Sequence, residues 1–293
     1  MASYYLASGI INRLIVKGAR ISYTTLEFQS GPPMAKLTLS SPENGNLISA
    51  AMAAEIRQAC QVIGEDDGLA LALLTGSGAC FSVGLDTGED TAGKNPPDEH
   101  DPAGSHEVAF SPDLHWIHDH QAASALASLP IPVIVAINGD AFDHGLELAL
   151  AGDIRIAAQD ARFGFTGLAQ GVLPWDGGTQ RLPRLVGTAW GRDMLLTGRV
   201  VDSTEALAMG LINRVAPREQ LMAEAQRLAE SIAAGGPVAA RYVKEAVLKG
   251  MDLSLNQGLG LEADLNVLLH GTGDRAEGIR SFLDRSPPRF SGS

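Results

Sequence analysis

AINGDAFDHGLELAL, residues 136–150, marks the point at which a buried strand of the chain turns into a helix. The apolar run at residues 133–137 is typical of a buried strand, and helical spacing begins at Leu146. The Asp-His-Gly turn between them predicts that the first N–H groups of the helix point into a cleft. Such groups, aligned with the helix dipole, can stabilise negative charge on a carbonyl oxygen. An ordinary strand-to-helix turn is the alternative that this stretch alone leaves open.

The segments before this turn predict the first half of an α/β domain. Residues 23–28 and 35–39 alternate with period two around Gly31-Pro32-Pro33, which predicts a hairpin. Residues 49–63 have helical spacing with Ser49 as the N-cap, and residues 69–75 form a buried strand. Strand-helix-strand order indicates a parallel sheet. Residues 84–111 have no period and predict a functional loop that covers a pocket.

The segments after the turn predict the rest of the sheet and a helical tail. Further elements are expected as a helix at 113–127, a strand at 153–158, a helix capped by Ser203, a strand at 211–215 and helices to residue 283. The sheet-containing core therefore ends near residue 215. Residues 1–22 are read as an N-terminal extension, because they lack the features of a signal peptide.

Composition excludes several classes of function. The formal net charge of −12 over 293 residues disfavours nucleic acid and anionic membranes as partners, since both attract clustered Lys and Arg. Cys60 and Cys80 are the two cysteines, too few for a disulfide framework, which favours a reducing, cytoplasmic location. No apolar run reaches the roughly 18 residues that a membrane span needs.

Several motifs at matching spacing resemble the crotonase (enoyl-CoA hydratase/isomerase) superfamily. They are GLELA at 145–149, GDI at 152–154, ARFG at 161–164 and GGTQRLPR at 177–184, supported by SPE at 41–43, CFSVGLD at 80–86, LTGRV at 196–200, GLINRV at 210–215 and DRAEG at 274–278. The resemblance covers about residues 23–290. It implies a crotonase-like α/β fold of stacked ββα units, with a core domain at 23–215 and a C-terminal helical region at 216–293. The family uses such a region to form trimers and hexamers.

The resemblance implies that two backbone N–H groups form an oxyanion hole, and these map to Leu85 and His144. A backbone donor survives a change of side chain, so the unusual histidine leaves the hole chemically intact. Its imidazole has two readings. It could move a proton near neutral pH, or it could be a turn histidine bonded to Asp143 or Glu147.

Glu147 matches the first of two glutamates that hydratases of this family use, whereas Gly167 stands at the position of the second. Asp176 offers a replacement carboxylate, since several branches of the family carry a catalytic aspartate there. We therefore predict that Glu147 and Asp176 share one cleft and handle protons or water. The alternatives are a helix cap for Asp176 and a first-turn helix carboxylate for Glu147.

Further side chains are candidates for the substrate pocket. Trp175, Phe142, Trp116 and His118 are expected to line it, with core or surface packing as the alternative. His115 and His118 share a helical face, but zinc sites need three or four convergent ligands and no cysteine lies nearby, so no metal site is expected.

The resemblance implies no cofactor other than coenzyme A carried by the substrate. Residues 44–48 lack a base and the 84–111 loop is acidic, so contacts to CoA phosphates would fall to Arg289 or Lys244, either of this chain or of a neighbouring subunit. This deficit raises the prospect of a substrate without CoA.

Three functions follow from these residues and the resemblance. The first is hydratase or isomerase action on an enoyl-CoA or cyclic dienoyl-CoA. The second is cofactor-independent hydrolysis of a carbon–carbon bond in a cyclic β-diketone, similar to 6-oxocamphor hydrolase. The third is a catalytically silent binding or scaffold protein.

Overall fold

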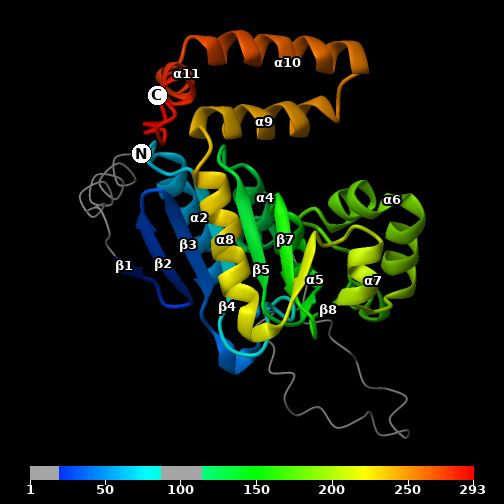
Figure 1. The fold of residues 1–293 in the computed structure, drawn as a ribbon. Coiled ribbons are helices and arrows are strands. Elements are labelled where there is room, and N and C mark those ends of the chain that lie inside the picture. Colours follow the sequence, from blue (N-terminus) through cyan, green and yellow to red (C-terminus); the bar gives the residue numbers. More distant parts are fainter. Residues whose placement is uncertain (1–19, 87–113) are drawn as a thin grey trace, which may run out of the picture.

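The computed structural model of the chain describes residues 20–86 and 114–293. In that part of the chain a large mixed sheet is covered by helices on both faces, and a layer of C-terminal helices stands beyond one end of the sheet (Figure 1). The predicted loop at 84–111 and the predicted extension at 1–22 lie largely outside the described residues.

The large sheet has the strand order β1-β2-β3-β4-β5-β7-β10. Its strands are β1 (Arg20–Ser22), β2 (Leu26–Gly31), β3 (Met34–Leu39), β4 (Leu71–Gly76), β5 (Val133–Ile137), β7 (Ile154–Ala158) and β10 (Arg214–Ala216). β1, β2 and β3 pair antiparallel, and the pairs from β3 to β10 are parallel. The predicted hairpin and parallel sheet are therefore present, and β1 extends the sheet into the N-terminal residues.

A second, small sheet holds β6 (Ala141–Phe142), β8 (Arg162–Gly164) and β9 (Val201–Asp202). β6 follows β5 after a short connection and leads straight into helix α5 (Asp143–Leu150). The predicted turn from strand to helix is thus confirmed, with a two-residue strand inserted into it.

The helices of the core are α2 (Ala50–Gly64), α3 (Leu114–His120), α4 (Ala123–Ala127), α5, α6 (Gly178–Thr197), α7 (Ser203–Ala208) and α8 (Leu221–Ala233). Short 3-10 helices lie at Pro42–Asn44, Gly167–Gln170 and Arg218–Gln220. Helix α8 packs on β4, β5 and β7, while α2 packs on β2 and β3 and also contacts α4. Because both faces are covered, every residue of β5 and nearly all of β4 are buried, which explains their continuous apolar sequences.

Two sequence predictions in the helices are wrong in detail. The single helix expected at 113–127 is divided into α3 and α4 after His120. Ser203 does not cap α7, because the side chain of Asp202 accepts the Glu205 amide at 2.8 Å and the Ser203 hydroxyl donates to the Ala158 carbonyl. Ser49 does cap α2 as predicted, accepting the Met52 amide.

The C-terminal layer contains α9 (Pro237–Gly250), α10 (Leu255–His270) and α11 (Gly273–Asp284). Lys244 of α9 ties it to the core, because its buried Nζ lies 2.8 Å from Asp153 Oδ2 and donates to the Ile131 carbonyl at 2.9 Å. Among the helices of residues 20–86 and 114–293, none combines the length and hydropathy that crossing a membrane requires.

Candidate active site

Two chain segments meet at the start of α5, beside the carboxyl ends of β4 and β5. The amide of Phe142 donates to the Ser82 carbonyl at 3.0 Å, which joins the segment after β4 to the segment after β5. A Cβ on Gly145 would lie only 2.3 Å from that same carbonyl oxygen, so glycine is required for this approach. Gly84 has φ of +134° and lies against Asp143. The two glycines bring the segments of Leu85 and His144 side by side.

The backbone amides of Leu85 and His144 are both unpaired within the described residues. The bridge between Ile48 and Leu85 uses the amides of Ile48 and Asp86, and leaves the Leu85 N–H without an acceptor in residues 20–86 and 114–293. His144 is the second residue of α5, whose first N–H groups have no partner inside the helix, and Phe142 supplies no side-chain cap. Two free donors therefore lie on adjacent segments, where the oxyanion hole is predicted.

Glu147 is a buried carboxylate, only 2% exposed, that connects three parts of the site. Its Oε1 accepts the amides of Asp176 at 2.9 Å and Gly178 at 2.7 Å, and its Oε2 lies 2.7 Å from His144 Nδ1. The Glu147 carboxylate thus joins α5 to the start of α6. The reading of His144 as a turn histidine bonded to Glu147 is confirmed.

The His144 ring is held between two acceptors. Its Nε2 lies 2.8 Å from the His120 carbonyl oxygen while its Nδ1 faces Glu147, an arrangement that fits an imidazolium donating from both nitrogens. Burial by itself lowers the pKa of His144. The hydrogen bond and charge of Glu147, the His120 carbonyl and the charge of Asp176 outweigh it, so the pKa is raised above its usual 6.5. The geometry and the direction of the pKa shift together favour a protonated His144 paired with the Glu147 carboxylate.

Asp176 lies beside Glu147 as predicted, but its carboxylate is occupied. Oδ2 accepts the amides of Ala122 and Ala123 at 2.7 and 2.6 Å, and Oδ1 accepts the amide and hydroxyl of Ser124 at 3.1 and 2.6 Å. These donors belong to the beginning of α4. Asp176 therefore caps α4, not α6, and its cap is the physical reason that the predicted long helix is divided.

An aromatic cluster adjoins the His144 ring. Trp175 lies 5.3 Å from His144 and 5.4 Å from Trp116 between ring centroids, and Trp116 stacks on His120 at 4.0 Å. Trp116 and Trp175 thus lie in one cluster with His144, and their predicted lining of a substrate pocket stays a prediction. Among the described side chains, the Trp175 Nε1 atom is buried without a hydrogen-bond partner.

The pocket-lining roles of His118 and Phe142 stay predictions. His118 is exposed among the described residues, and the buried histidine of its helix is His120. The Phe142 ring lies under the Arg162 guanidinium, 5.7 Å from it. Within the described part of the chain no group of three or more His, Cys, Asp or Glu residues is arranged to hold a metal ion.

Asp143 and His120 are site residues that the sequence analysis did not select. The Asp143 carboxylate accepts the Thr166 hydroxyl at 2.7 Å and the Gly167 amide at 2.9 Å, so it lies against the position where a second carboxylate was expected. The i,i+4 spacing of Trp116 and His120 could have identified the buried histidine. For Asp143 the only signal was its place in the turn.

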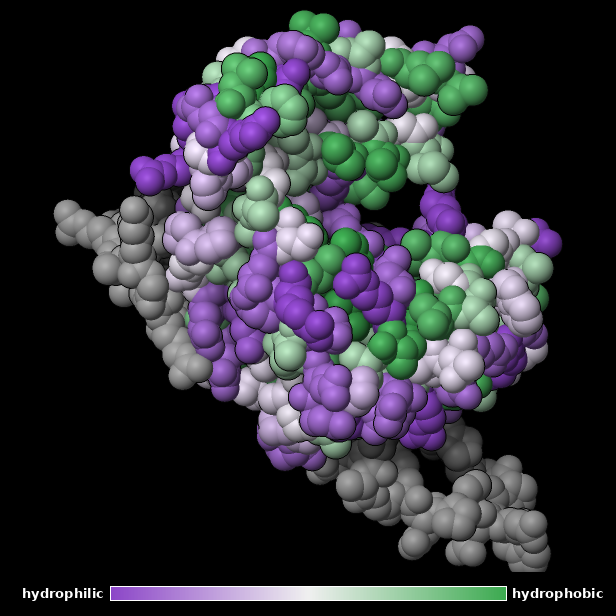
Figure 2. Space-filling view, in the orientation of Figure 1, coloured by the Kyte–Doolittle hydropathy of each residue, from purple (hydrophilic) through white to green (hydrophobic). Residues whose placement is uncertain are grey.

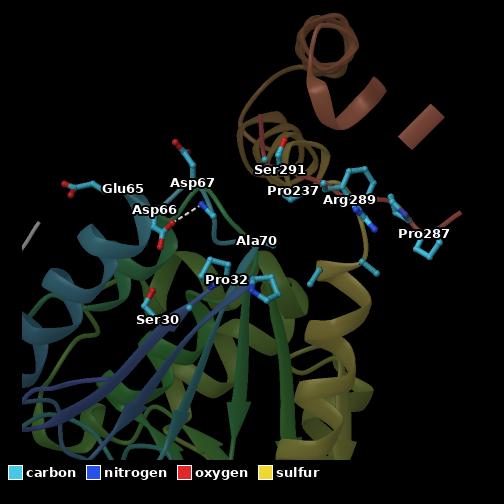
Figure 3. Close-up of a pocket in the computed structure, with 18 residues that line it drawn as sticks. Ser30, Pro32, Glu65, Asp66, Asp67, Ala70, Pro237, Pro287, Arg289 and Ser291 are labelled. Carbon is cyan, nitrogen blue, oxygen red and sulfur yellow. Dashed lines mark hydrogen bonds between the residues drawn. The ribbon is translucent and has the colours of Figure 1, made fainter. Parts of the chain in front are cut away.

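The cavity of about 1020 Å³ shown in Figure 3 is distinct from this site. It lies at the amino end of β4, between the β2–β3 hairpin, the acidic loop at residues 65–68 and the C-terminal segment at 287–292. None of the candidate catalytic groups lines it. Arg289 does, and Lys244 is buried against Asp153, so neither of the bases expected to serve a CoA phosphate lies at the site within this chain.

Comparisons with known proteins identify the family of the chain. The family model for Enoyl-CoA hydratase/isomerase matches residues 30–293. Crotonyl-CoA hydratase of Syntrophomonas wolfei is 30% identical over 278 residues, covering 92% of this chain and 99% of that protein. The mitochondrial methylglutaconyl-CoA hydratase of Rattus norvegicus is 42% identical over 171 residues, which are 57% of this chain and 54% of that protein. The crystal structure of enoyl-CoA hydratase from Bacillus anthracis matches with a TM-score of 0.81 and 33% identity, covering 92% of this chain and 100% of that one.

The buried ion pair predicts a pH-dependent contribution to stability. Because the pKa of His144 is raised in the folded state, the stabilisation is complete below pH 6.5 and is lost as the pH rises through the raised value. Each unit of raised pKa adds about 1.4 kcal/mol. We expect wild type to have a higher free energy of unfolding than His144→Gln, and we expect this gap between the two proteins to be largest at acidic pH. Urea denaturation across pH 5 to 9 measures it. The gap should narrow with rising pH.

The Glu147→Gln variant is the matched control, because it removes the charge that raises the pKa of His144. In that background the pH dependence contributed by His144 should disappear. A gap between wild type and His144→Gln that widens as the pH rises would show that burial dominates and that the ring is neutral.

Proposed function

The chain belongs to the enoyl-CoA hydratase/isomerase family, and from that premise we propose that it adds water across the carbon–carbon double bond of an enoyl-CoA thioester. Water addition at the β-carbon moves the electron pair of the double bond toward the thioester carbonyl. The developing enolate oxygen then needs donors that are already in place. The names of the relatives favour a CoA thioester over a diketone.

The single observation that carries this proposal is that the amides of Leu85 and His144, on adjacent segments, have no acceptor in the part of the chain that the structure describes. The positive end of the α5 dipole lies at the same point, and so does the His144 imidazolium. All three favour negative charge on an oxygen bound there. Loss of one such donor typically lowers kcat by about 100-fold to 1000-fold.

We assign Glu147 and Asp176 to holding this arrangement. Of the roughly four lone-pair sites of a carboxylate, Glu147 uses three and Asp176 uses all four. Glu147 keeps His144 charged and fixes the start of α6, while Asp176 fixes the start of α4. Direct proton transfer by Asp176 would require the α4 cap to open.

We also propose that the chain works as a homotrimer or hexamer. The C-terminal layer exposes large apolar side chains, and Figure 2 shows apolar surface gathered over it. The residues are Val243, Val247, Met251, Leu255, Val267, Phe282 and Leu283. An apolar surface of this extent is typical of a protein–protein contact.

The function is tested with a panel of enoyl-CoA thioesters, following loss of the conjugated double bond by absorbance and identifying the product by NMR. Leu85→Pro removes one oxyanion donor and should lower kcat by about 100-fold. Leu85→Ala is the matched control, since it keeps the N–H and should retain activity near wild type. Equal activity of the two variants, with both folded by circular dichroism, would contradict the oxyanion assignment.

The assembly is tested by light scattering. Wild type should have three or six times the mass of one chain, and Val267→Glu with Phe282→Glu should lower it. Leu196→Glu, an exposed apolar position on α6, is the control and should leave the mass unchanged. A monomeric wild type would rule the proposal out.

A further inference from the structure

Among the described residues around the start of α5, the carboxylates of Glu147, Asp176 and Asp143 differ in their free capacity to accept a proton. Glu147 and Asp176 are almost fully buried. Two main-chain amides and the His144 ring occupy three lone-pair sites of Glu147. Three main-chain amides and the Ser124 hydroxyl occupy four lone-pair sites of Asp176. Asp143 uses two of about four, and its side chain is partly exposed. A group that exchanges protons with water and substrate needs such free sites.

Asp143 also lies between the two free amides. The peptide bond that follows Asp143 carries the His144 N–H. On the other side, a Cβ built on Gly84 would be 3.7 Å from the Cβ of Asp143, and Gly84 directly precedes the Leu85 N–H. An acyl oxygen bound by both amides would therefore bring the neighbouring carbon atoms of the thioester close to the Asp143 side chain.

The backbone of Asp143 is unusual for its position. Its φ is +46°, in the left-handed region that non-glycine residues rarely adopt. Arg285, which also has positive φ, ends α11, where that conformation is common, whereas Asp143 begins a helix. Strain of this kind is concentrated at functional sites. The Asp143 carboxylate accepts the Thr166 hydroxyl and the Gly167 amide, and its own backbone directly precedes the His144 amide.

We propose that Asp143 is the catalytic acid–base group of the hydration, an inference that rests on the proposed function. The carboxylate accepts one proton from water as the water oxygen bonds to the β-carbon. The electron pair of the double bond forms the enolate, whose oxygen is held by the Leu85 and His144 amides. The Asp143 carboxylic acid then delivers its proton to the α-carbon. The carboxylate is regenerated, and one water has been added.

The assignment is tested by steady-state kinetics on an enoyl-CoA that wild type hydrates. Asp143→Asn tolerates the same backbone conformation but cannot take up the proton, so kcat should fall by about 100-fold or more with KM little changed. Asp143→Gly also fits a positive φ and leaves space for a small acid. Added formate should restore part of its activity, as expected when a missing carboxylate is replaced.

Two controls separate proton transfer from positioning. Thr166→Val removes a hydrogen bond to the carboxylate but keeps the charge, and Asp140→Asn removes a carboxylate of the same segment that pairs with Arg162. Both should stay within a few-fold of wild type. The assignment is overturned if Asp143→Asn keeps wild-type kcat, if Thr166→Val loses as much activity, or if formate has no effect on Asp143→Gly. Wild type that hydrates none of the thioesters would overturn the proposed function, and this assignment with it.

Discussion

The buried Glu147 carboxylate is the constraint on which the rest of the site depends. A carboxylate removed from water is strongly unfavourable unless it is paired and hydrogen-bonded. Here it has three partners from two places. The His144 ring lies on the same helix, and the amides of Asp176 and Gly178 lie at the start of α6. Since those partners must be in place for Glu147 to be buried, one side chain fixes α5, α6 and the imidazole relative to one another.

The hydrogen-bond network of Glu147 continues through Asp176 to the start of α4. Asp176, whose amide serves Glu147, uses its own carboxylate to start α4, and the carbonyl of His120 just before α4 accepts the His144 ring. The side chains of His144, Glu147 and Asp176 thus belong to one hydrogen-bond network around the start of α5. The main-chain amides of Leu85 and His144 do not take part in this network. In this account they are the donors kept for the substrate.

Much of the fold could be predicted because its causes are local. The apolar runs of β4 and β5, the cap at Ser49 and the turn before α5 each carry their signal within a few residues. The break between α3 and α4 could not be predicted, because its cause is Asp176, more than 50 residues later in the chain. Glu147 does lie against Asp176, whereas the shared catalytic cleft predicted for the two carboxylates stays a prediction. The oxygens of both carboxylates accept hydrogen bonds from main-chain amides, and these contacts depend on distances that no sequence pattern shows. His120 was not singled out, because its burial and its stacking with Trp116 follow from packing.

The most direct test of the central claim is a crystal structure of the protein with an unreactive acyl-CoA bound. The thioester oxygen should lie within hydrogen-bonding distance of both the Leu85 and His144 amides, with Glu147 still bonded to His144 and to the amides of Asp176 and Gly178. A thioester oxygen bound away from these amides, or a Glu147 carboxylate that has left them to contact the substrate, would contradict it.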